Sequence, residues 1–228
     1  MGGGVPGRFA VATGELLCQS NFAEPVFALL DDGEFLRRLY SQLAKYGLTL
    51  SGMRWEEASS FGDEKLTCAV ANLNSVVNIL LERVEVHCLD VTRLDRAVFK
   101  ELVSDTLQAV GAYQGNSLKT HAFSLTMHGT IAGLPPRDFL RRFVPSSPDL
   151  GPSIGTGVAF YYGAAADRVI AAPTAGLSPI IHDTLFVRIH GVWDAEKVGT
   201  AAFIANAESF INRALDSLGL SLAVQSSS

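Results

Sequence analysis

The sequence predicts an α+β fold in which one β-α-β-β-β-α unit occurs twice, with antiparallel sheets that carry their helices on one face. Two observations support this fold class. Apolar residues alternate along several short segments, as in strands with one buried face, and recur at helical spacing along others. The order of predicted elements in the first half of the chain also recurs in the second. Two long copies predict a pseudo-twofold pair, because the units of repeat arrays are only about 20–50 residues long.

The first half is predicted to contain a strand, a helix, three strands and a second helix. These elements cover residues 16–28, 33–47, 49–59, 65–74 and 82–91, with the second helix from 92 onward. Phe35 and Leu39 lie on one helical stripe, and Gly47 ends that helix because glycine readily adopts the left-handed conformation. Thr92 and Asp95 have the spacing of a capping box, which predicts the start of the second helix.

The second half is predicted to contain the same elements in the same order. They cover residues 120–133, 135–144, 155–166, 168–178, 183–194 and 195–218. In the last helix Phe203 and Phe210 mark the buried side. Asp194 is its expected N-cap, and Gly219 its expected C-terminal glycine.

Short sequence matches connect the two halves at almost one offset. A shift of 104 residues places residues 34–39 (EFLRRL) on residues 138–143 (DFLRRF), and a shift of 103 places residues 84–87 (VEVH) on residues 187–190 (VRIH). Amphipathic helices share such strings by chance, so the repeated order of six elements carries more weight than any single match.

These matches predict the boundaries of the units. The expected division is a flexible N-terminal tail at residues 1–8, a first unit at 9–117, a second unit at 118–221 and a flexible C-terminal tail at 222–228. A sheet of about four strands leaves an edge with unpaired backbone groups, and joining two units edge to edge would satisfy them. We therefore expect the units to form one compact body.

Composition restricts the class of protein and its partners. Of the 228 residues 48% are apolar and 18% are charged, as in a globular protein, and the formal net charge of −5 argues against a nucleic-acid partner. The three cysteines include no C-x-x-C pair, which predicts neither a disulfide framework nor a structural zinc site. The first residues lack the apolar core of a signal peptide, and no apolar run is long enough to span a bilayer. We expect a soluble, cytoplasmic protein.

Four residues at matching positions of the two halves form the candidate binding site. His87 and Glu85 share one strand face, and His190 and Arg188 share the corresponding face of the matching strand. If the halves meet near these strands, Glu85 and Arg188 could form an ion pair, with two imidazoles available as acid, base or ligand. The alternative is a solvent-facing sheet surface, on which such residues only confer solubility.

The sequence predicts no catalytic residue, metal site or cofactor. The histidines lack the spacing of a zinc protease helix, and His121 and His128 are expected on opposite faces of one strand. We therefore expect a non-catalytic assembly, scaffold or adaptor protein that acts through protein–protein contacts or self-association. One alternative is a small-molecule-binding protein, with a pocket between helices and sheet or at the pseudo-twofold seam. The other is a histidine-dependent hydrolase or nuclease.

Overall fold

The centre of the structure is a pair of long antiparallel strands, β1 (Gly7–Phe22) and β6 (Leu118–Ile131). This computed structural model describes residues 7–27, 32–57, 64–111, 117–143, 157–161 and 168–222. Most of the two predicted tails, residues 1–6 and 223–228, therefore lies outside the described residues. Gly7 already belongs to β1, although the sequence predicted a tail through residue 8.

Helices and further strands follow each central strand. The strands are β2 (Leu48–Glu56), β3 (Lys65–Val70), β4 (Ser75–Leu80), β5 (Arg83–Cys88), β7 (Gly157–Ala159), β8 (Arg168–Leu177), β9 (Leu185–Asp194) and β10 (Leu220–Leu222). The α-helices are α2 (Gly33–Leu43), α3 (Arg96–Gly111), α4 (Pro136–Leu140) and α5 (Thr200–Ser217). Short 3-10 helices are η1 (Ala44–Tyr46), η3 (Ala71–Leu73) and η4 (Val91–Arg93).

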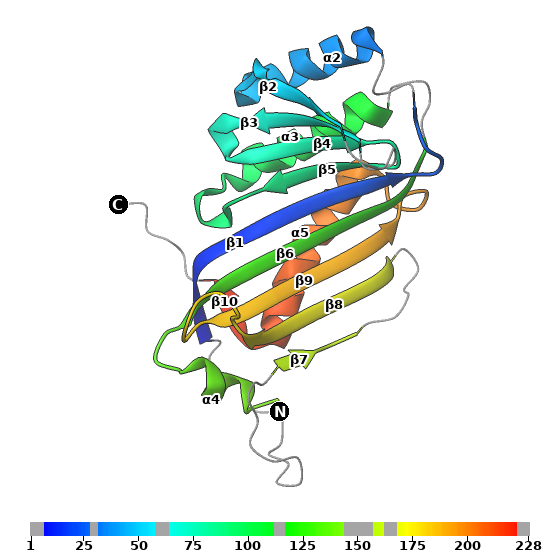
Figure 1. Cartoon of the computed structure of the whole chain (residues 1–228). Coiled ribbons are helices and arrows are strands. Elements are labelled where there is room, and N and C mark those ends of the chain that lie inside the picture. Colours follow the sequence, from blue (N-terminus) through cyan, green and yellow to red (C-terminus); the bar gives the residue numbers. More distant parts are fainter. Residues whose placement is uncertain are drawn as a thin grey trace.

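The ten strands of the described residues form one sheet in the order β2-β3-β4-β5-β1-β6-β9-β8-β7, and β10 pairs with β1 (Figure 1). Neighbouring strands are antiparallel except for β10, which is parallel to β1. In Figure 1 the sheet lies in front of α3 and α5, so that these helices cover its far face and leave the near face open. The predicted α+β class with an antiparallel sheet is confirmed.

Strand β1 is longer at its start than the predicted segment at residues 16–28. Its first half is rich in glycine and alanine, which are weak strand signals, but pairing with β6 and β10 holds it in the sheet. Phe9 in this part is fully buried. At Gly14, a Cβ atom would lie 2.4 Å from the Thr126 carbonyl oxygen, so the close approach of β6 requires glycine there.

The first half contains four strands after α2, so the predicted unit with three is wrong for this half. The segment predicted as one strand at residues 65–74 ends at Val70, and the chain turns through η3. Asn74 adopts a positive φ of 46° at this turn, a conformation that asparagine tolerates better than most residues. β4 then follows directly, and it was missed because its apolar run alternates poorly.

Two helices begin later than their predicted starts. Asp95, and not Thr92, caps α3, since its carboxylate accepts hydrogen bonds from the N–H groups of Ala97 and Val98. The last helix begins at Thr200, and its N-cap is Gly199. The carboxylate of Asp194, the predicted cap, accepts the Glu196 N–H in the turn before the helix.

The helix-covered face packs into two hydrophobic clusters that share residues. One surrounds Phe123, Trp193 and α5, and the other surrounds α2, α3 and the strands β3 to β5. Leu16 and Cys18 of β1 contact both clusters. The clusters therefore form a continuous core behind one sheet.

Candidate functional site

The uncovered face of the sheet carries a broad set of polar side chains. They stand on alternate positions of their strands, opposite the buried apolar positions, as the pleat requires. They are Glu15, Gln19, Asn21, Arg54, Thr67, Asn78, Arg83, Glu85, His87, Thr120, Ser124, Thr126, Thr174, Arg188 and His190. All four predicted site residues are members of this face, as the alternation of β5 and β9 indicated.

The two predicted histidines lie in one row across this face. His87 is directly opposite Leu17 on β1, Leu17 is opposite Ser124 on β6, and Ser124 is opposite His190 on β9. Three strand spacings of about 4.8 Å put about 14 Å between the two histidine positions. The imidazoles therefore belong to one surface but do not converge on one ligand atom.

Glu85 and Arg188 do not form the ion pair that was considered for them. The halves meet at β1 and β6, which separate β5 from β9. Glu85 instead pairs with Arg83 at 2.6 Å, and the Arg188 Nε donates a hydrogen bond to Ser124 Oγ at 3.2 Å. Each charged residue is thus engaged within its own half of the sheet.

The two histidines have different surroundings. His87 Nε2 lies 3.2 Å from Glu15 Oε2, in a pair whose carboxylate is 61% exposed. Such an exposed pair contributes little to stability. His190 Nδ1 is buried and has no hydrogen-bond partner among the described residues. Burial, and then the charge of Arg188, lower the pKa of His190, so this imidazole is neutral at pH 7.

Two other histidines have defined partners that the sequence did not reveal. His128 is on the uncovered face and His121 is on the helix-covered face, as expected from their separation. Ser178 Oγ accepts the N–H groups of Ile180 and Ile181, so its own proton is directed to His128 Nδ1 at 2.8 Å. This contact fixes the turn that follows β8.

His121 is the most deeply buried of the histidines. Its Nδ1 is hydrogen-bonded to Ser20 Oγ at 2.7 Å, and its ring stacks on Phe203 at 4.7 Å between centroids. The side chain is only 1% exposed, and burial lowers its pKa to about 4. Only the register of β1 against β6 brings Ser20 to His121, so spacing along the sequence could not show this pair.

Two open grooves lie near these residues. One, of about 470 Å³, is at the end of the uncovered face where β1, β5 and β6 meet, and Gln19, Asn21, Arg83 and Thr120 line it. The other, of about 510 Å³, lies where α3 approaches the start of α5, and His121 contributes to its lining. Both depressions are open to solvent.

The described residues contain no cluster of three or more His, Cys, Asp or Glu side chains with the geometry to hold a metal ion. The three cysteines are free, and burial raises the pKa of Cys18 and of Cys68 to about 12. These thiols are therefore poor nucleophiles at neutral pH.

No protein-family model matches the chain, and no curated protein shows significant sequence similarity to it. Within the described part of the chain, every helix is too short or too polar to cross a bilayer. The uncovered face and the two grooves are therefore interpreted from their geometry alone.

Proposed function

We propose that this chain is a non-catalytic assembly, scaffold or adaptor protein that acts through protein–protein contacts on the uncovered face of its sheet. One observation carries the proposal: many polar side chains of this face hydrogen-bond to one another in small groups, and they do not converge on a reacting centre. Since α3 and α5 occupy the opposite face, a partner has access to this one (Figure 1).

Two of these hydrogen-bonded groups cross from strand to strand. Thr67 Oγ1 donates to Asn78 Oδ1 at 3.0 Å, and Asn78 Nδ2 lies 3.5 Å from Glu85 Oε2. Across the central strands, Asn21 Nδ2 donates to Thr120 Oγ1 at 2.8 Å. Side chains that are already ordered lose little conformational entropy when a partner binds, which favours a preformed protein-binding surface.

Apolar side chains lie between these hydrogen-bonded groups. The same face as the polar groups also carries the half-buried side chains of Leu17, Val76 and Phe186. A mixture of polar and apolar area is typical of interfaces that form between separately stable proteins. We include His87, His190, Glu85 and Arg188 among the proposed contact residues, because all four are members of this face.

Site-specific photo-crosslinking tests this proposal. A photoreactive amino acid at Arg188 samples the uncovered face, and the same amino acid at Arg213 on α5 is the matched control, since both side chains are exposed. In the native host, we expect position 188 and not position 213 to give a discrete crosslinked protein species. Equal labelling at positions 188 and 213 would contradict the proposal. The absence of a crosslinked species both at position 188 and at Thr126, a second position on the uncovered face, would also contradict it.

We also propose that the two halves, residues 9–117 and 118–221, derive from an internal duplication and are related by a pseudo-twofold axis. The supporting observation is the order of strands in the sheet. In each half the first strand pairs antiparallel with the last strand before the long helix, β1 with β5 and β6 with β9, and β1 and β6 meet at the centre of the sheet. On this interpretation β4 corresponds to residues 178–183, which form the turn between β8 and β9 in the second half.

A small-molecule-binding function is a second candidate, favoured by the groove of about 510 Å³ between α3 and α5. Its lining combines the apolar Leu107 and Leu118 with the polar Gln108 and Thr200, as ligand sites do. A ligand there would shift the NMR signals of the His121 ring. A screen of small carboxylic acids and alcohols that leaves these signals unchanged would count against this candidate.

A further inference from the structure

Strand β2 forms one end of the sheet, and its outer edge has no neighbouring strand among the described residues. Its first part is irregular: the pairing with β3 shifts between Leu48 and Met53, and the Gly52 N–H donates to Thr49 Oγ1 at 3.2 Å. From Met53 to Glu56 the pairing is regular. This short stretch therefore presents unpaired backbone groups to a further strand.

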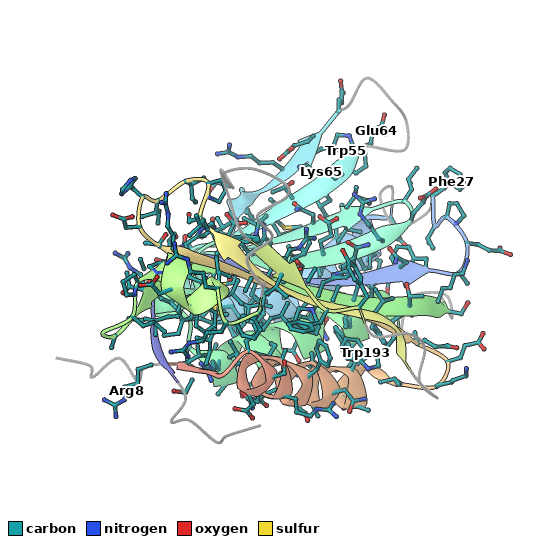
Figure 2. All side chains as sticks on the ribbon, turned by 90° about the horizontal axis from the view of Figure 1, so that it is seen from below. Arg8, Phe27, Trp55, Glu64, Lys65 and Trp193 are labelled. Atoms are coloured by element: carbon teal, nitrogen blue, oxygen red, sulfur yellow. The ribbon has the colours of Figure 1, made fainter. Side chains whose placement is uncertain are left out.

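The side chains of this stretch differ between the two faces. Trp55 is on the helix-covered face, opposite the buried Leu66, yet 42% of it is exposed. Figure 2 shows Trp55 at the outer strands near Lys65, well separated from Trp193 beside α5. Arg54 and Glu56 are on the uncovered face. An exposed tryptophan on a free edge indicates a contact surface.

The charges of this stretch are incompletely paired. Glu56 Oε2 lies 3.1 Å from Lys65 Nζ on β3, whereas Arg54 forms no ion pair with any described residue. The nearby Thr67 hydroxyl and then Lys65 lower the pKa of Glu56, and the charge of Arg54 adds to this effect. Among the described residues, the edge thus carries one cation without an ion-pair partner, Arg54, and one accessible carboxylate, Glu56, two positions apart.

We propose that β2 pairs with β2 of a second copy of this chain, antiparallel and about a twofold axis that passes through Trp55. In this register Trp55 is opposite the partner's Trp55. Arg54 of each copy is opposite Glu56 of the other copy, so this pair of opposite charges forms twice. The sheets become continuous, with the helices of both copies on one side. Opposite charges and paired aromatic side chains both stabilise cross-strand pairs.

Other registers that keep the two faces aligned lack this complementarity. An axis through Arg54 would place the two Arg54 side chains opposite each other. An axis through Glu56 would place the two Glu56 carboxylates opposite each other. Centring it on Met53 brings in the irregular part, where the Gly52 N–H is already bonded. Only the Trp55 register sets unlike charges opposite each other on the regular stretch.

The contact covers only residues 53–57, so we expect a weak dimer whose population depends on concentration. It joins the outer edges of two β2 strands and involves only Arg54 and Glu56 of the uncovered face, and so goes beyond the function proposed above. The two proposals have separate tests, and the failure of one does not decide the other.

Charge reversal with the full chain tests the register. We expect Arg54→Glu and Glu56→Arg each to weaken self-association at least about tenfold in sedimentation velocity, because each sets like charges opposite each other at two places. An equimolar mixture of the two variants restores unlike charges at both places and should associate like the unchanged protein. Arg213→Glu on α5 is the matched control and should leave association unchanged.

Fluorescence provides an independent measurement of the same contact. The chain has two tryptophans, and Trp193 is buried, so a Trp193→Phe variant leaves Trp55 as the only reporter. Its emission should shift to shorter wavelength as protein concentration rises, and this shift should be absent in Arg54→Glu. A strictly monomeric protein, a dimer insensitive to both reversals, or a mixture that fails to associate would each overturn the proposal.

Discussion

At the scale of single residues, His121 shows how burial changes the chemistry of an ordinary side chain. Its ring lies between Phe203 and the sheet, and Ser20 provides its only hydrogen bond among the described residues. A charged imidazole at this position would lose its hydration without gaining a carboxylate. His121 is therefore a neutral core residue, and its proton affinity couples folding to pH.

This coupling predicts a loss of stability in acid. The pKa of His121 is about 4 in the folded protein and about 6.5 in a solvated chain, so the unfolded state binds more protons between these values. Stability should fall as the pH drops from about 6.5 to about 4, and His121 should account for about 3 kcal/mol of that loss. Denaturant unfolding at several pH values measures it.

The matched control is the double variant Ser20→Ala with His121→Phe. It keeps a ring under Phe203 and leaves no buried hydroxyl without a partner. Its free energy of unfolding should decline less between pH 6.5 and pH 4, because the remaining groups titrate as before. An identical decline in both proteins would show that His121 does not cause the loss.

At the scale of elements, the sequence predicted the positions of helices and alternating strands better than it predicted which strands are adjacent in the sheet. Val84, Val86 and Cys88 alternate with polar residues, and that pattern correctly assigned the faces of β5. In β4, Val76 and Val77 are adjacent and obscure the alternation, so this strand was missed. The sequence also assigned His87 and His190 to equivalent faces. Their separation depends on which strands lie between them, and local periodicity does not contain that information.

The cap of α3 is a prediction that belongs to this scale. Asp95 accepts two N–H groups of the first helical turn, at 3.0 and 3.2 Å. Replacing Asp95 with Ala should therefore destabilise the protein by about 1 kcal/mol, measured by urea unfolding. Thr92→Ala tests the capping box that the sequence indicated. If Thr92→Ala lowered the free energy of unfolding more than Asp95→Ala, Asp95 would not be the cap of α3.

At the scale of the whole molecule, the proposed sequence repeat does not correspond to two independent folding units. β1 belongs to the first half by sequence, yet Phe9 is buried in the cluster of the second half. Gly7 and Phe9 also pair with β10 at the end of the second half. Leu16 joins both clusters, so neither half can complete its core alone.

This shared core predicts that both halves unfold in one cooperative transition. Two single-tryptophan variants can report on it, because Trp55 is in the first half and Trp193 in the second. The Trp193→Phe variant retains Trp55 as the probe of the first half, and the Trp55→Phe variant retains Trp193 as the probe of the second half. At protein concentrations at which the chain is monomeric, and after correction for the stability change of each variant, both probes should give the same denaturant midpoint as circular dichroism. Phe9→Ala should lower the midpoint of both probes together, with a loss of about 3–5 kcal/mol. If only the Trp193 transition moved, the halves would be separate units, and β1 would not couple them.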